Sequence, residues 1–157
     1  MSKDYAILAS GCFWCTETIF DNVNGVLSVV PGYIGGSTKN PTYEQVCSGT
    51  TGHAEAVKIE YDSNIISFDE LLEVFFKTHD PTTLNRQGND VGTQYRSAIF
   101  YTNEEQKKIS ENSIHILNKE KFEGKIVTEI TKATTFFPAE EYHQHYNRKM
   151  KKKYGIS

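Results

Sequence analysis

Segments with strand patterns and segments with helix patterns alternate along the 157-residue chain, and this alternation constrains the fold most. Strands are recognised by apolar or β-branched runs and by period-two alternation, and helices by a period of 3.6. The alternation predicts an α/β (α+β) fold in a single domain, residues 1–157, built as a two-layer sandwich of helices on a mixed sheet. The order of the strands stays open. Strands are expected over residues 5–9, 26–30, 54–61, 97–101 and 126–130, and helices over 13–20, 42–47, 67–78, 102–121 and from 138.

Several boundaries carry local signals. Ser67 and Thr102 each precede a Glu by three residues, the pattern of a capping box, so a helix is expected to begin after each. Pro138, with two acids after it, predicts the start of the last helix. Residues 79–95 are polar and show no periodic pattern. A loop of that length in a compact domain is usually functional or mobile.

Composition excludes several classes of protein. A hydrophobic fraction of 38% permits a packed core, and a net charge of -3 offers no bulk attraction to nucleic acid. No apolar run approaches the roughly 20 residues that span a bilayer, and the N-terminal apolar stretch is too short for a signal peptide. The three Cys are an odd number, which argues against a secreted disulfide framework. We therefore expect a cytoplasmic protein with working thiols and without a nucleic-acid or membrane partner.

The segment Gly-Cys-Phe-Trp-Cys, residues 11–15, lies where a strand is expected to turn into a helix. A Cys in the first helical turn faces unpaired backbone N–H groups and the positive end of the helix dipole. Both favour the thiolate, so the pKa of Cys12 is expected to be lowered and Cys12 to be a nucleophile. Cys15 lies on the same helix face, where a disulfide with Cys12 is geometrically plausible. Phe13 and Trp14 belong either to the core or to an apolar wall for a substrate.

These five residues and several longer motifs resemble those of the peptide methionine sulfoxide reductases of the A type. The other motifs lie at residues 32–36, 40–49, 51–55, 79–97 and 137–144, and together they follow the family's order and spacing over residues 6–146. The resemblance implies a ferredoxin-like sandwich that reduces methionine S-sulfoxide, free or in proteins, to methionine. It implies repair of proteins after oxidative stress. We expect a monomer that needs no metal or organic cofactor.

Reduction of a sulfoxide by a thiol needs a thiolate, a proton donor, neutral hydrogen-bond donors around the oxygen and a pocket for the methyl group. The resemblance places the proton donor at Glu55, and burial at the start of its strand would raise the pKa of this carboxyl. Neutral hydroxyls suit the oxygen because they donate without bringing charge. For substrate binding the resemblance implies Tyr43, Asp90 and Tyr95 around the oxygen, Phe13 and Trp14 around the methyl group, and Tyr142 with His143 nearby.

Taken singly, each candidate also has an ordinary structural interpretation. A Cys after a strand is often inert and buried, aromatic residues usually pack in a core, and Glu55 would otherwise be a solvated residue on the polar face of a strand. A lone surface Tyr usually packs its ring against the protein and leaves its hydroxyl in solvent. Asp90, which lies between glycines, suits a turn. Only the joint occurrence of these residues favours a site.

The recycling thiol is the point at which the chain departs from many relatives. After oxygen transfer Cys12 would be a sulfenic acid, which a second thiol converts to a disulfide. Many relatives keep that thiol in a C-terminal tail, but no Cys follows Cys47. We expect Cys15 to be the resolving residue and Cys47 to be structural, with Cys47 or an external thiol as the alternatives. Thioredoxin or a similar dithiol would then reduce the disulfide.

Two other functions fit parts of the sequence. Residues 12–15 form a Cys-x-x-Cys pair, as in a thioredoxin-like thiol–disulfide oxidoreductase. Alternatively, the Cys and His residues would form a zinc-binding interaction module. His53 and Glu55 match the His-x-Glu of zinc deaminases, but there this pair precedes the Cys pair, whereas here it follows. The histidines concerned are His53, His79, His115, His143 and His145.

Overall fold

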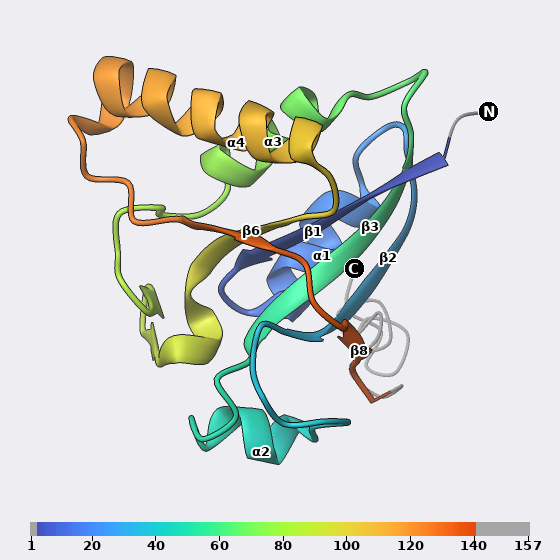
Figure 1. Cartoon of the computed structure of the whole chain (residues 1–157), viewed down its shortest axis with the longest axis vertical. Helices are drawn as coiled ribbons and strands as arrows, with labels where there is room; N and C mark the ends of the chain where they lie inside the picture. The colour runs from blue at the N-terminus through green and yellow to red at the C-terminus, as the bar shows by residue number, and fades with distance from the viewer. Residues whose placement is uncertain (1–2, 141–157) are drawn as a thin grey trace, which may run out of the picture.

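A six-stranded mixed sheet forms the centre of the computed structural model, which describes residues 3–140 (Figure 1). Neighbouring strands are antiparallel except for β6 and β7, which are parallel. The expected mixed sheet is therefore confirmed. In spatial order the strands are β7 (Glu129–Lys132), β6 (Ser97–Tyr101), β1 (Lys3–Ser10), β3 (Ala54–Asp62), β2 (Val26–Ile34) and β8 (Phe137–Pro138).

The central part of the chain follows the order β1-α1-β2-β3-α3-β6. This β-α-β-β-α-β connectivity is that of a ferredoxin-like fold, which confirms the expected fold class. Strands β7 and β8 extend the sheet at its two edges. The helices are α1 (Phe13–Asp21), α2 (Tyr43–Cys47), inserted between β2 and β3, α3 (Phe68–Lys77) and α4 (Glu104–Leu117), which continues as a π-helical turn, η2 (Asn118–Phe122).

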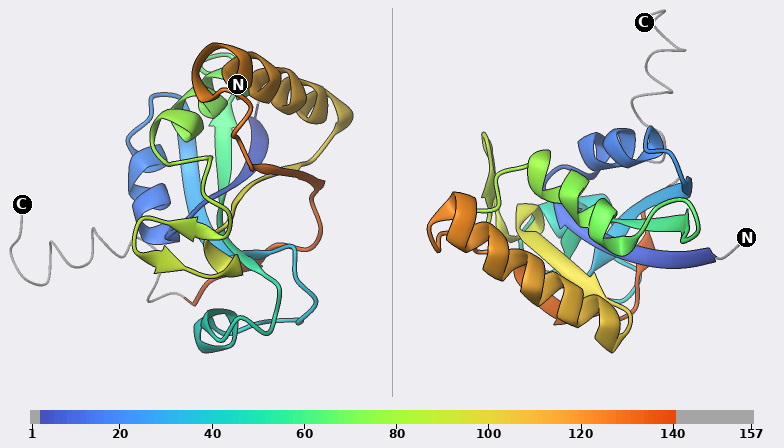
Figure 2. Two further views of the ribbon diagram at one scale, coloured as in Figure 1. Left: turned by 90° about the vertical axis from the view of Figure 1, so that its left-hand side faces the viewer. Right: turned by 90° about the horizontal axis from the view of Figure 1, so that it is seen from above.

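Both faces of the sheet are covered, one by helices and the other by a short segment of chain. Successive residues of a strand point to opposite faces, so Leu8 of β1 joins the main core while Ile7 joins a smaller cluster behind the sheet. The main core lies under α1 and α3, with α4 beside α3 (Figure 2). The smaller cluster is covered by Ala133 and Phe136 from the segment before β8. No helix within residues 3–140 has the length and apolar character needed to cross a membrane.

The helix caps agree with the sequence at α3 and differ at α4. Ser67 and Glu70 form the predicted capping box, with hydrogen bonds of 3.1 and 3.2 Å. At α4 the N-cap is Asn103, whose side chain accepts the Gln106 N–H at 2.8 Å. The predicted cap, Thr102, is therefore wrong by one residue. Asn is a better N-cap than Thr, and Thr102 donates to the Gln106 side chain instead.

The end of β2 and the start of β8 also differ from the prediction. Strand β2 was expected to end at residue 30 but continues through Pro31. The Pro31 carbonyl accepts the Ala139 N–H at 2.8 Å, so Pro31 faces the edge of the sheet at β8, where its missing N–H is tolerated. Pro138 lies in β8 opposite Gly32 and does not begin a helix within the described residues. The strand expected over 126–130 is β7, which begins three residues later.

The long polar segment before β6 is ordered against the first strand-to-helix turn. It contains a hairpin of β4 (Arg86–Gln87) and β5 (Asp90–Val91), followed by a 3-10 turn, η1 (Thr93–Tyr95). Gly11 has φ +101, and a Cβ there would meet the Gln87 side chain at 2.7 Å, so only glycine allows the hairpin to lie this close. The hairpin therefore lies beside the start of α1 (Figure 2).

Candidate active site

Cys12 is the N-cap of α1, directly after β1, and its side chain is half-buried. The backbone N–H groups of Trp14 and Cys15 donate to its sulfur, as expected for a helix start. Burial nevertheless raises the pKa of Cys12 to about 11, and the nearby Cys15 and Glu55 add to the rise. The expectation of a lowered pKa is therefore wrong, because loss of solvation outweighs two backbone hydrogen bonds. Near neutral pH the group is a thiol.

Glu55 lies in the second position of β3 and is 1% exposed. Its Oε1 accepts the Phe13 N–H at 3.3 Å, while its buried Oε2 has no hydrogen-bond partner among residues 3–140. Burial raises the pKa of Glu55 to about 8; the Phe13 N–H opposes this and the Asp90 charge adds to it. The raised pKa expected from the sequence is confirmed. Glu55 is a protonated carboxylic acid at neutral pH, with one oxygen unused.

Three aromatic rings form an apolar wall beside Cys12. Tyr43, the first residue of α2, stacks on Phe13 with ring centroids 6.2 Å apart and on Trp14 with centroids 6.0 Å apart. Phe13 is 1% exposed and belongs to the main core, whereas Trp14 is half-buried. The core interpretation of Phe13 is therefore confirmed, and the Phe13 ring also supports the half-buried ring of Trp14 and the Tyr43 ring that stacks on both.

Two hydroxyls and one carboxylate lie around the same place. Burial raises the pKa of Tyr43 well above its usual range and that of Tyr95, in η1, to about 12, with the Glu55 charge contributing to both. Both phenols thus stay neutral donors. Asp90, exposed in β5, raises the pKa of Glu55 and of Tyr95 through its charge. The structure therefore brings Cys12, Glu55 and these three residues together from separate elements.

The two remaining cysteines are exposed free thiols. Cys15 lies one turn into α1, and its N–H contacts the Cys12 sulfur. Cys47 ends α2, where the Tyr43 hydroxyl donates to its sulfur, and burial raises the pKa of Cys47. The sequence predicts a structural Cys47, but this thiol lies at the surface beside the site. Tyr142 and His143 lie outside the described residues.

The sequence model for the family described as "Peptide methionine sulfoxide reductase" matches residues 4–156. The chain belongs to the peptide methionine sulfoxide reductase family. Curated relatives named "Peptide methionine sulfoxide reductase MsrA" identify it with the A type. The relative from Saccharolobus solfataricus is 57% identical over 94% of this chain and 83% of its own length, and that from Acinetobacter baumannii (strain AYE) is 56% identical over 92% and 82%.

Solved structures of the family share the fold. Reduced Mxr1 from Saccharomyces cerevisiae has a TM-score of 0.86 at 35% identity, covering 99% of this chain and 87% of Mxr1. Methionine sulfoxide reductase A of Corynebacterium diphtheriae has a TM-score of 0.83 at 36% identity, covering 94% and 74%. Mxr1 is also known in complex with Trx2, and in that form the TM-score is 0.64 at 27% identity, covering 92% and 84%.

His53 is held by the backbone. Its Nδ1 accepts the Gly36 N–H at 3.0 Å and its Nε2 donates to the Thr38 carbonyl at 2.7 Å, so both ring nitrogens are used. The ring ties the loop after β2 to the start of β3, two residues before Glu55. Within residues 3–140 no group of three or more His, Cys, Asp or Glu is arranged to hold a metal ion.

Glu140 is a residue of the site region to which sequence reasoning assigned no role. Its Oε1 accepts the Tyr33 hydroxyl at 3.0 Å, and its Oε2 accepts the Tyr43 N–H at 3.1 Å. It belongs to the family motif at residues 137–144, but nothing in its local pattern indicates contact with residue 43. Glu140 therefore joins the C-terminal segment to the aromatic wall.

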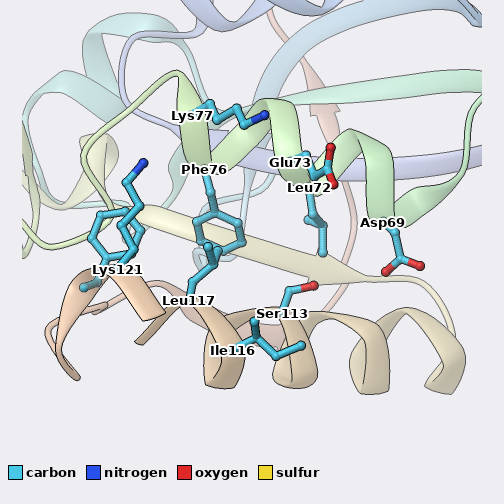
Figure 3. A pocket seen from close by; sticks show the side chains of 10 residues that line it. Asp69, Leu72, Glu73, Phe76, Lys77, Ser113, Ile116, Leu117 and Lys121 are labelled. Atoms are coloured by element: carbon cyan, nitrogen blue, oxygen red, sulfur yellow. The ribbon is translucent and has the colours of Figure 1, made fainter. Parts of the chain in front are cut away.

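A groove of about 320 Å³ lies elsewhere, between α3 and α4 (Figure 3). Leu72 and Phe76 of α3 face Leu117 of α4 across it, and Lys77 and Lys121 stand at one end. Its lining contains no thiol, imidazole or phenol. The groove therefore lacks the thiol nucleophile that sulfoxide reduction requires.

Proposed function

We propose that this protein reduces methionine S-sulfoxide, free and in proteins, to methionine through a Cys12 sulfenic acid. The observation that carries the proposal is the pairing of Cys12 with Glu55, a buried acid with a pKa of about 8 and an unused Oε2. This pair supplies the nucleophile and the proton donor, and the wall of Phe13, Trp14 and Tyr43 beside it accepts a methyl group.

The first step transfers oxygen and leaves the proton count unchanged. The Cys12 thiolate attacks the sulfoxide sulfur and forms an Sγ–S bond while Glu55 donates a proton to the oxygen. The oxygen then moves to Cys12 Sγ as the substrate S–O bond and the Sγ–S bond break, which releases the thioether. Cys12 is oxidised to the sulfenic acid and the substrate is reduced to a thioether. Because Cys12 starts as a thiol, its own proton restores the Glu55 acid.

The hydroxyls stabilise the oxygen as negative charge develops on it. Tyr43 and Tyr95 donate without charge, and their raised pKa values keep them protonated throughout the accessible pH range. In this proposal Asp90 orients a water molecule or a Tyr hydroxyl toward the oxygen, and Tyr142 completes the substrate site.

The second step closes the cycle through Cys15. The Cys15 thiol attacks the Cys12 sulfenic acid, which forms a disulfide and releases water. The contact of the Cys15 N–H with the Cys12 sulfur supports this pairing, and the first helical turn must loosen to allow disulfide geometry. Cys15 is exposed, so a dithiol protein can reach it, and the complex of Mxr1 with Trx2 supports thioredoxin in that role.

The proposed setting is repair of oxidised proteins in the cytoplasm during oxidative stress, by a monomer without a cofactor. Exposed thiols such as Cys15 and Cys47 persist where the cellular thiol pool is reduced, which supports that compartment.

The deciding experiment measures consumption of each purified methionine sulfoxide epimer with dithiothreitol as reductant. We expect turnover of the S epimer alone. Turnover of the R epimer alone would overturn the assigned stereochemistry. A thiol–disulfide oxidoreductase would instead reduce a disulfide substrate and convert neither epimer, and that result would refute the proposed function.

A further inference from the structure

We propose that Glu140 is a positioning residue that holds Tyr43 on the rings of Phe13 and Trp14 and thereby sets how tightly the sulfoxide oxygen is bound. The inference rests on the proposed function, because it concerns the hydroxyl that is assigned there to the sulfoxide. Glu140 itself touches neither the substrate nor the reacting atoms in this proposal. It acts through the backbone of residue 43.

The geometry is a bridge between two elements. One carboxylate oxygen of Glu140 accepts the Tyr43 N–H at 3.1 Å, and the other accepts the Tyr33 hydroxyl at 3.0 Å. Tyr33 is fully buried in β2, lies opposite Glu55 in the sheet and packs on Phe13 with ring centroids 5.7 Å apart. Glu140 thus anchors Tyr43 to a residue fixed in the core directly behind the site.

Helix α2 needs such an anchor. It has five residues, and an isolated helix of that length is unstable in water. Its capping box uses Thr42 and Gln45 but leaves the Tyr43 N–H to another acceptor. Glu140 supplies that acceptor as a carboxylate, and hydrogen bonds to an ionised acceptor are stronger than neutral ones. The Tyr43 ring then rests on Phe13 and Trp14 at the distance that forms the wall.

The chain carries a reporter for this position that does not depend on activity. Trp14 is the single Trp of the sequence, and its ring stacks on the Tyr43 ring at 6.0 Å with an interplanar angle of 23°. A displaced Tyr43 would uncover Trp14. Acrylamide quenching of Trp14 fluorescence therefore measures whether residue 43 stays in place.

The experiment compares Glu140→Ala with Tyr33→Phe, which removes the hydroxyl that Glu140 binds at the core end of the bridge. We expect Glu140→Ala to increase quenching of Trp14 and to raise KM for the sulfoxide roughly tenfold, as for loss of a charge-assisted hydrogen bond. Glu140→Gln keeps one acceptor oxygen and should recover most of both. Tyr33→Phe weakens the core end of the bridge, so it should shift quenching and KM in the same direction as Glu140→Ala but by less.

A double-variant test separates positioning from a general effect on the fold. In a Tyr43→Phe background the hydroxyl is already absent, so adding Glu140→Ala should change KM by less than about twofold. A tenfold change that persists in this background, or unchanged quenching in Glu140→Ala, would overturn the proposal. If the wild type reduces no sulfoxide, the proposed function fails, and the quenching comparison still decides whether Glu140 holds Tyr43.

Discussion

The two halves of the active site are built differently. The inner cradle, Cys12, Phe13 and Glu55, comes from the central strands β1 and β3 and the start of α1. The outer wall, Tyr43, Asp90 and Tyr95, comes from a five-residue helix, a two-residue strand and a 3-10 turn. The inner groups are thus held by the sheet and its core, and the outer groups by short elements fixed by individual side-chain contacts.

The difference separates chemistry from binding. In the inner cradle, burial shifts two pKa values, to about 11 for Cys12 and about 8 for Glu55, and in the proposed mechanism these values determine where the protons reside. In the outer wall the phenols remain neutral across the physiological range and serve as donors. Changes to the inner cradle should therefore alter the rate and pH dependence of the chemical step. Changes to the outer wall should alter binding of the sulfoxide and, to a small extent, the pKa of Glu55.

Cys12→Ser should give the largest effect, a complete loss of sulfoxide reduction, because the hydroxyl ionises far less readily than the thiol. Methionine formation with dithiothreitol measures it. Ser is a favoured N-cap, and its hydroxyl can accept the N–H groups of Trp14 and Cys15 that now bond the Cys12 sulfur, so α1 should lose no stability. An inactive variant with undiminished thermal stability is the expected result, and appreciable activity would refute the assignment of the nucleophile.

Glu55→Gln should slow the first turnover by roughly 10²–10⁴, because the amide keeps the shape of the side chain but delivers no proton. The second-order rate constant of the wild type should rise with pH up to about 8, as the thiolate fraction grows, and then level off as Glu55 loses its proton. In the variant it should continue to rise toward pH 11, the region in which Cys12 ionises. Single-turnover rates that match the wild type at every pH would exclude Glu55 as the acid.

The inner cradle was predictable because its signals are local. The apolar run, the turn at Gly11 and the aromatic pair after Cys12 together indicate a strand that turns into a helix with a thiol at its start. The alternating pattern predicts the strand that carries Glu55, but it places this residue on a polar face, and only the family resemblance assigns it to the site; the structure buries both faces of β3 around Glu55. The pKa of Cys12 was mispredicted because the helix start is a local feature, whereas the burial of the sulfur depends on packing of segments distant in the sequence.

The outer wall was predictable only through resemblance. Tyr43 and Cys47 were expected in a short helix, but the Tyr43 N–H of that helix is bonded by Glu140, which is 97 residues away along the chain. No periodicity reports such a contact. The order of the strands and the pairing of Pro138 in β8 likewise arise from tertiary packing that a local pattern does not encode.

Cys15→Ser tests recycling and should leave the first turnover intact, since attack on the sulfoxide requires only Cys12. One methionine per enzyme should form, the sulfenic acid should accumulate in a dimedone-type trap, and steady-state turnover with thioredoxin should fall at least tenfold. Cys47→Ser is the matched control and should turn over like the wild type.

Mass spectrometry of the wild type after one equivalent of sulfoxide, without reductant, identifies the disulfide. A bond from Cys12 to Cys15 is expected. A bond from Cys12 to Cys47 would move the resolving role to the outer wall, and the absence of any internal disulfide would assign it to an external thiol.

Stability should report the protonation of Glu55 independently of activity. Its folded pKa of about 8 lies above the ordinary value of 4.5, so between these values the native state binds the extra proton and the free energy of unfolding falls as pH rises. Between pH 7 and 9 the loss should be about 1.4 kcal/mol. Glu55→Gln lacks this loss. The difference in the free energy of unfolding between the two proteins, measured by denaturant titration, should therefore change by that amount from pH 7 to pH 9. An equal decline in both would contradict a buried acid with this pKa.

Asp90→Asn should have the smallest effect and shows how far the outer wall influences the inner cradle. Burial contributes most to the raised pKa of Glu55, and the charge of exposed Asp90 adds a smaller part. Without that charge the pKa of Glu55 falls, so the level part of the rate profile should begin at a lower pH. The rate at pH 7 should change less than about threefold, because exposed charges interact weakly through solvent. If the profile keeps its shape while KM rises, Asp90 contributes through orientation of the Tyr95 hydroxyl and not through its charge on the acid.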